Sequence, residues 1–304
     1  MTTRVVLAII SIISSVLLIF LIVYGTETLA GTLSCAIRTP SCLEGETTIW
    51  RMSGTSNAHA ELPNQTNYTH LVCCSGVEGL GNSCSGTFGV ALKLSSPTNA
   101  HVEQNNQLNY ANNACISVPT GGSLLVGYQA DNCLGFDTSL GSISGTTNAH
   151  LGDSLAYPTK ICATAAGPVI SVTITANDTI SYGMLPAGGS RSTHSGDMDT
   201  TIIAQNDGTV TEIFNIRGQN TACPWTLAAT VGGDQYVHQF CKTTDVSCTS
   251  PPANYTPLST SYQTLYTGVA TGQTRNFDLR IIVPNPSSCF TQQSVDVTIQ
   301  AVQE

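Results

Sequence analysis

Charged side chains are scarce in this sequence: Asp, Glu, Lys and Arg together make up 10% of its 304 residues, against roughly 25% in average soluble domains. The ten Lys and Arg residues are spread thinly. The chain therefore has no basic patch to neutralise nucleic-acid phosphates, and we exclude nucleic acid as a partner. Ser, Thr, Asn and Gly take the place of charge, which is typical of secreted β proteins.

Motifs of catalysis and cofactor binding are also lacking. The sequence has no nucleophile elbow, His-Glu-x-x-His pair, phosphate loop or dinucleotide fingerprint. Its six histidines fall in loops or in alternating segments. His238 alternates with Tyr236 and Phe240, which predicts a strand residue rather than a base. We expect no catalytic residue, no cofactor and no enzyme activity.

One long apolar run is present, and it stands near the N-terminus. Residues 5–24 contain no charge, and Arg4 precedes them. This length suffices for a membrane-spanning helix, and the positive residue before it places the rest of the chain outside the cytoplasm. Residues 1–30 are either a signal peptide cleaved after Ala30 or an uncleaved signal anchor. The run exceeds the usual signal-peptide core of about 7–15 residues, which favours an anchor helix with the membrane as its partner.

All twelve cysteines follow this run, in one group of eight and one group of four. Even groups in an exported chain indicate disulfides. A zinc site is disfavoured because no Cys-x-x-Cys pair occurs and the adjacent Cys73 and Cys74 are a poor chelating pair. The predicted disulfide cysteines are Cys35, Cys42, Cys73, Cys74, Cys84, Cys115, Cys133, Cys162, Cys223, Cys241, Cys248 and Cys289.

Residues 31–165 contain a pattern that occurs three times. Each copy opens with a cysteine, reaches an apolar residue after nine positions, passes through Asn-Ala-His, and continues to a tyrosine that stands five residues before a closing cysteine. The copies run from Cys42 to Cys73, from Cys84 to Cys115, and from Cys133 to Cys162. We read each copy as two strands around a turn-rich loop, stapled by its own two cysteines.

The staples matter because so small a unit cannot bury a core by itself. Cys35 and Cys74 remain, and we expect them to pair. Three such units permit either a closed, trefoil-like β domain with threefold pseudosymmetry or a linear stack, and the sequence does not choose between these arrangements.

The histidines of the three Asn-Ala-His elements are the candidate metal ligands: His59, His101 and His150. In a closed array they would meet on the axis and suit Zn²⁺ or Cu²⁺, with Glu61 or Glu103 orienting them. In the simpler interpretation each Asn and His only fixes its own turn, and the three histidines lie far apart. We favour the simpler interpretation, and so predict no firm metal site.

Residues 166–304 show the alternation of half-buried strands, for example at Ile170, Val172 and Ile174. Asn206-Asp207-Gly208 between apolar segments indicates a turn joining two strands. We expect an immunoglobulin-like β-sandwich whose four cysteines allow three pairings.

The segments Ile180 to Gly188, Ala204 to Val210 and Asp234 to His238 resemble the immunoglobulin-like domains of uncharacterised bacterial cell-surface proteins. Trp225-Thr-Leu227 is similar to the Trp-x-Leu wall-binding domains of Gram-positive bacteria, whose second motif is matched loosely by residues 277–284. The resemblance implies a fold and a surface location, and no activity.

Together these features predict an all-β protein with an N-terminal transmembrane or signal helix, a disulfide-stapled three-repeat domain and a β-sandwich. We expect a non-catalytic protein of the cell envelope, secreted or membrane-anchored, that serves as a surface, adhesion or assembly module. Its partners would be other envelope proteins or glycans. The alternative function is a metal- or glycan-binding module built on the Asn-Ala-His elements.

Overall fold

The computed structural model describes the backbone of residues 17–24 and the whole of residues 31–304. These residues form strands, turns and loops, and no helix occurs in the part described. The predicted all-β class is therefore confirmed. Six disulfides use all twelve cysteines, and none is free.

The expected N-terminal helix is not found where the structure describes that segment. Residues 17–24 form a strand, β1 (Leu17–Tyr24), between β14 (Thr179–Gly183) and β23 (Ser294–Gln303). An unbroken run of eight apolar residues satisfies a buried helix or a buried strand equally well, so the helix prediction had no periodicity to support it. Residues 1–16 and 25–30 of the predicted segment lie outside the described residues. Within the described part, no helix is long and apolar enough to cross a membrane.

The described chain divides into two compact units. The N-terminal unit comprises residues 31–169, and the C-terminal unit comprises residues 170–304 together with β1.

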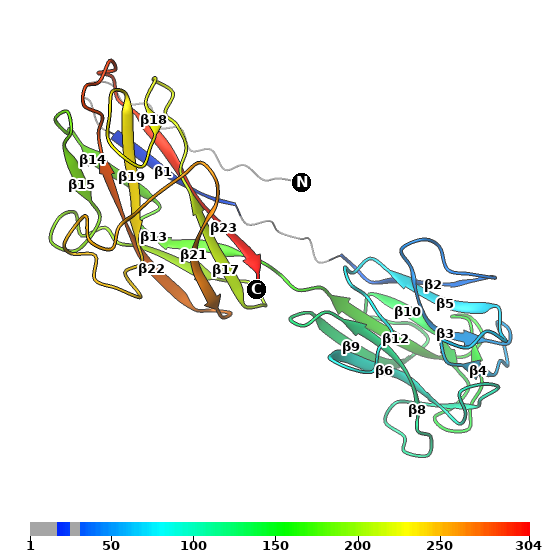
Figure 1. Ribbon diagram of the computed structural model, residues 1–304. Helices are drawn as coiled ribbons and strands as arrows, with labels where there is room; N and C mark the ends of the chain where they lie inside the picture. The colour runs from blue at the N-terminus through cyan, green and yellow to red at the C-terminus, as the bar shows by residue number, and fades with distance from the viewer. Residues whose placement is uncertain (1–16, 25–30) are drawn as a thin grey trace. The chain divides into compact units, whose positions relative to one another are not determined.

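The N-terminal unit contains three small sheets around one hydrophobic core (Figure 1). In each sheet a two-residue strand borders a longer antiparallel pair. The first sheet is β2 (Ser34–Arg38), β5 (His70–Ser75), β3 (Thr47–Met52) and β4 (Ala60–Glu61). The second is β7 (Val102–Glu103), β6 (Thr87–Leu94) and β8 (Asn112–Val118). The third is β11 (Leu151–Gly152), β10 (Thr138–Ile143), β12 (Thr159–Ala166) and β9 (Ser123–Ala130).

Disulfides staple the N-terminal unit as the sequence predicts. Each of the three segments closes on itself through its first and last cysteine, and the remaining two cysteines pair between neighbouring strands β2 and β5. The bonds are Cys42–Cys73, Cys84–Cys115, Cys133–Cys162 and Cys35–Cys74. Each self-closing bond spans 29 to 31 residues.

Backbone pairing between the three segments closes them into a ring. Ala58 pairs with Leu151, Ala100 with Ala60, and Ala149 with Val102, each through two hydrogen bonds of 2.9 Å. The alanine before each histidine thus bonds the residue after the histidine of another segment, and the third segment returns to the first. The arrangement is closed, not a linear stack.

The C-terminal unit has two sheets (Figure 1), and its buried apolar residues form one core. The five-stranded sheet has the order β14, β1, β23, β17 (Glu212–Arg217) and β21 (Gln263–Val269). The path of the other sheet is β13 (Val172–Ala176), β16 (Ile202–Asn206), β22 (Thr274–Ile282), β19 (Gln235–Cys241) and β18 (Thr226–Leu227). Off this path, β15 (Ser190–Ser192) pairs with β22 and β20 (Thr256–Pro257) with β19.

Of the three cysteine pairings that the sequence left open, the structure has Cys223–Cys289 and Cys241–Cys248. The first bond closes a long loop of the unit and the second a short one, with sequence separations of 66 and 7 residues.

Candidate metal centre

Each Asn-Ala-His element lies in a loop of the same construction. The asparagine adopts a left-handed backbone, with φ of 48° at Asn57, 47° at Asn99 and 46° at Asn148. Asparagine tolerates this region better than most residues, which explains its place in the pattern. Six residues before each histidine a serine N–H donates to the histidine carbonyl over 3.0 Å; these serines are Ser53, Ser95 and Ser144. The simpler interpretation of the sequence, that the element fixes its own turn, is therefore correct as far as the backbone is concerned.

Ring closure, however, brings the three histidine side chains together. The imidazole centroids of His59 and His101 lie 4.8 Å apart, those of His101 and His150 4.6 Å, and those of His59 and His150 5.2 Å. Our expectation that the three would lie far apart is wrong. It treated each loop alone, whereas the alanine on one side of each histidine and the apolar residue on the other pair with different segments, so the histidines surround a common axis.

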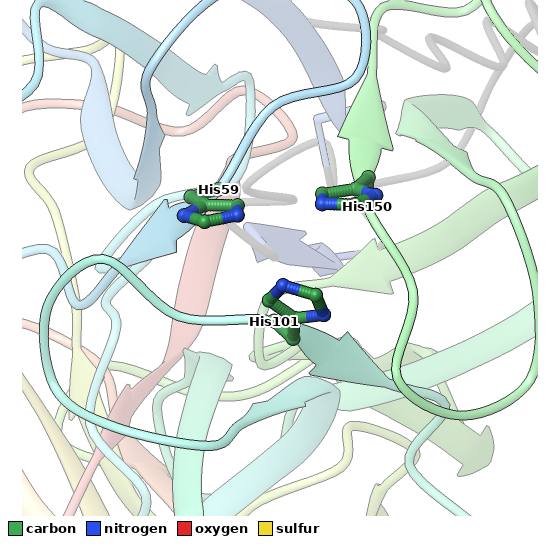
Figure 2. A group of neighbouring side chains, drawn as sticks. All are labelled: His59, His101 and His150. Atoms are coloured by element: carbon green, nitrogen blue, oxygen red, sulfur yellow. The ribbon is translucent and has the colours of Figure 1, made fainter.

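The three rings present nitrogen atoms to one another. One ligand nitrogen from each ring can be chosen so that all three lie within 4.8 Å of one another. Figure 2 shows each ring directing a nitrogen towards the space between them. Nitrogens bound to one tetrahedral zinc ion at about 2.0–2.1 Å would be roughly 3.4 Å apart. Rotamer adjustments of about an ångström would close the set around an ion.

The electrostatic surroundings of His150 favour its neutral form. Burial lowers the pKa of His150 below its ordinary value of 6.5, and the nearby His101 and His59 lower it further because protonated rings repel. The Nδ1 atom of His101 is buried and has no hydrogen-bond partner among the described residues. A buried ring nitrogen without a partner is costly, and a cation among the three rings would provide one.

The His59 ring is positioned by hydrogen bonds that were not predicted from the sequence. The Nδ1 atom of His59 lies 2.5 Å from Oδ1 of Asn99, and the hydroxyl of Tyr68 donates to the same oxygen over 2.9 Å. Asn99 belongs to the next segment along the chain, so this contact exists only because the ring is closed. The repeated asparagine and tyrosine were visible in the sequence, but their partners were not.

The two glutamates that we expected to orient the histidines do not do so. Glu61 accepts hydrogen bonds from the backbone N–H of Tyr68 and the side chain of Asn67, at 2.8 and 3.0 Å. Glu103 makes the same bonds with Tyr110 and Asn109, at 2.8 and 2.9 Å. Both glutamate side chains are fully buried and serve the loop that leads to the tyrosine.

In the third segment a different residue accepts the hydrogen bond of the tyrosine N–H. Its loop is shorter and has Gly152 at the glutamate position, and there the N–H of Tyr157 donates to the hydroxyl of Ser142 over 3.1 Å. The glutamates therefore accept hydrogen bonds from their own loops, and the prediction that they orient the histidines is wrong.

Other groups with ligand chemistry are weaker candidates in the described part of the chain. Cys42, Glu46 and Cys73 cluster, but the two cysteines are joined in a disulfide and are not thiolates. His238 lies on β19, fully buried, with Nε2 3.3 Å from the hydroxyl of Tyr182, and burial lowers its pKa to about 3. It is a strand residue, as the alternation predicts.

Comparisons with known proteins add no assignment, because no protein family, no curated protein and no solved structure matches this chain.

Proposed function

We propose that the N-terminal unit is a metal-binding module that holds one divalent transition-metal ion through His59, His101 and His150. The observation that carries the proposal is the convergence of three imidazoles, with ring centroids 4.6 to 5.2 Å apart, from segments widely separated in sequence. Three neutral imidazoles with an open fourth position suit Zn²⁺ and Cu²⁺, and exclude the hard cations that prefer oxygen ligands.

Binding is favoured over catalysis by the surroundings of the rings. A zinc ion held by three imidazoles can itself lower the pKa of a bound water to about 7, so hydrolysis would further depend on nearby groups that orient a substrate and relay its protons. Glu61 and Glu103, the carboxylates that stand two residues after His59 and His101, are buried and bonded to their own loops. We therefore keep the interpretation that the protein is not an enzyme.

The disulfides also bear on where the protein acts. Six disulfides indicate an oxidising environment outside the cytoplasm. We propose that the protein acts at the cell envelope, as a surface or assembly module whose C-terminal unit is an immunoglobulin-like sandwich. The two sheets around one core support that fold, and the low charge supports that location.

The test is metal binding by the full chain, produced in an oxidising compartment and stripped with a chelator. Calorimetric titration with Zn²⁺ and Cu²⁺, and elemental analysis after dialysis, are expected to give one ion per chain. Replacing His101 by Ala should weaken metal binding at least tenfold, because the ion loses one of its three imidazole ligands. His70→Ala is the matched control, since His70 lies on β5 of the same unit and outside the cluster.

Retention of the native disulfides and an unchanged melting temperature of the metal-free variant would show that His101→Ala still folds. The proposal is wrong if the wild-type chain retains no more metal than the variant in which all three histidines are replaced. Cobalt substitution adds a spectroscopic check, because three nitrogen ligands in a tetrahedral site give visible d–d absorption that the variants should lose.

A further inference from the structure

The position of β1 in the C-terminal unit is unusual for its place in the sequence. It pairs in parallel with β23 over seven residues, from Leu18 opposite Ser294 to Tyr24 opposite Gln300, and antiparallel with β14 on its other side. Among the described residues, β14 has no other partner in its sheet, and β23 otherwise pairs only with β17. The described structure thus has a slot between β14 and β23, filled by a strand from before the N-terminal unit.

The slot borders the centre of the core. Ile180 and Tyr182 on β14, and Val295, Val297 and Ile299 on β23, are all at most 2% exposed. Without a strand between them, a row of backbone N–H and C=O groups on β23 would lose its partners beside this apolar surface. An open edge of that kind is a template for pairing with another chain. The segment in the slot has the sequence Leu-Leu-Ile-Phe-Leu-Ile-Val-Tyr, and continuous apolar runs of this kind are typical of strands whose two faces are both covered.

No local turn ties β1 to its slot. A parallel neighbour cannot be reached through a short hairpin. Here the chain passes from β1 through the whole N-terminal unit before it returns at Val172. A strand tethered through so long a connection makes the same contacts whether it enters its own sandwich or that of a second copy, which is the condition for exchange of identical elements.

We propose that the slot between β14 and β23 is an assembly site that accepts residues 17–24 of a second copy of this chain. The partner contributes a strand without which the five-stranded sheet is incomplete, and the donor's own slot receives the next copy. Such head-to-tail contacts generate open filaments unless the rotation closes a ring. The recognition is main-chain pairing in a fixed register, and the sequence of the added strand is an unbroken apolar run.

This use of residues 17–24 differs from both fates that the sequence predicted. A signal peptidase cut after Ala30 would remove the strand, and a membrane anchor would hold it in lipid. The assembly proposal requires that the segment remains on the mature chain and lies in a slot. It does not depend on metal binding, because the site lies in the C-terminal unit and the histidines in the N-terminal unit.

The assembly proposal can be tested with cysteines placed at paired positions of β1 and β23. Phe20 lies opposite Asp296, and neighbouring strands are about 4.8 Å apart, which is within the Cα separation of a disulfide. Full-length Phe20→Cys and Asp296→Cys chains, carrying different affinity tags, are co-expressed in an oxidising compartment. We expect a heterodimer linked between positions 20 and 296 by peptide mapping. The double variant is expected to give a ladder of multimers on non-reducing gels.

Two controls make the outcome decisive. Phe20→Cys combined with Ser190→Cys should not cross-link, because β15 pairs with β22 in the other sheet. Intact masses and retention of the six native disulfides establish that the variants fold. A monomer with an internal 20–296 link overturns the proposal in favour of the chain's own strand. Absence of any 20–296 link, or loss of residues 1–30 from the mature chain, overturns it in favour of an anchor or a removed signal.

Discussion

The Oδ1 atom of Asn99 accepts a hydrogen bond from the Nδ1–H of His59 over 2.5 Å and a second from the Tyr68 hydroxyl over 2.9 Å. An amide oxygen can only accept, so the Nδ1 atom of His59 carries the proton and its Nε2 atom has the free lone pair. Asn99 therefore fixes the tautomer in which His59 can bind a metal through Nε2. Partners of this kind commonly change metal affinity by about 10–100-fold.

We predict that Asn99→Gly weakens zinc binding by about 10–100-fold. Glycine accepts the left-handed backbone of this position, with φ of 47°, so the change removes the acceptor without straining the loop. Asn148→Gly is the matched control, because Asn148 has φ of 46° and its side chain makes no bond to a histidine in the described structure. Equal losses in the two variants, measured by competition with a chromogenic chelator, would show that only the loop matters.

A second prediction concerns pH. The pKa of His150 is lowered in the folded protein by burial and by the neighbouring rings. The unfolded chain therefore binds this proton more readily, and stability is lost as pH falls below about 6.5. We expect the melting temperature of the metal-free protein to decrease from pH 7 to pH 5, and His150→Gln to flatten that part of the curve. Zinc should raise the melting temperature at pH 7 and lose this effect on acidification, since protons compete for the same nitrogens. Parallel curves for the wild type and His150→Gln would contradict the prediction.

Much of the N-terminal unit was predictable because its covalent pattern repeats. Matched spacing from Cys42 to Cys73 and in the two later copies was enough to pair six cysteines correctly. Closure of the ring was not predictable, since it rests on backbone bonds such as Ala58 to Leu151 between residues far apart in the sequence. The small residue before each histidine was a signal of close packing that we did not use: Ala58, Ala100 and Ala149 are at most 3% exposed.

The prediction of an N-terminal helix was wrong for a different reason. Residues 17–24 are uniformly apolar, and such a run carries no period to distinguish a membrane helix from a strand paired on both sides. The deciding information lies in β14 and β23, more than 150 residues later in the chain. No local rule could have supplied it.

A third prediction follows from Glu212 at the start of β17. Its side chain is fully buried, Oε1 accepts the N–H of Ser171 over 2.7 Å, and Oε2 has no partner among the described residues. Burial raises its pKa to about 7, and the carboxylate of Asp207 adds to the rise. The folded state holds this proton more tightly than the unfolded chain, so stability is lost as pH rises from about 4.5 to about 7.

Glu212→Gln should therefore stabilise the C-terminal unit at pH 8 by roughly 1–3 kcal/mol and change little at pH 4. Glutamine keeps the acceptor for Ser171 and removes the buried charge. The measurement is the protection of β17 amides by hydrogen exchange at the two pH values. Asp245→Asn, which neutralises an exposed carboxylate of the same unit, is the control. A stabilisation that is equal at pH 4 and pH 8 would assign the effect to packing rather than to charge.

The fourth prediction compares the two disulfides of the C-terminal unit. Cys223–Cys289 spans 66 residues and Cys241–Cys248 spans 7. If a disulfide acts mainly by restricting the unfolded chain, the first contributes about 4 kcal/mol and the second about 2 kcal/mol. Replacing each pair by alanine should therefore lower the midpoint of guanidinium unfolding more for the long loop. The buried surroundings of Cys241 and Cys248, which are 0% and 1% exposed, oppose this order, because packing around the short loop would be lost as well. A larger destabilisation from removing Cys241–Cys248 would show that native-state packing outweighs chain entropy in this unit.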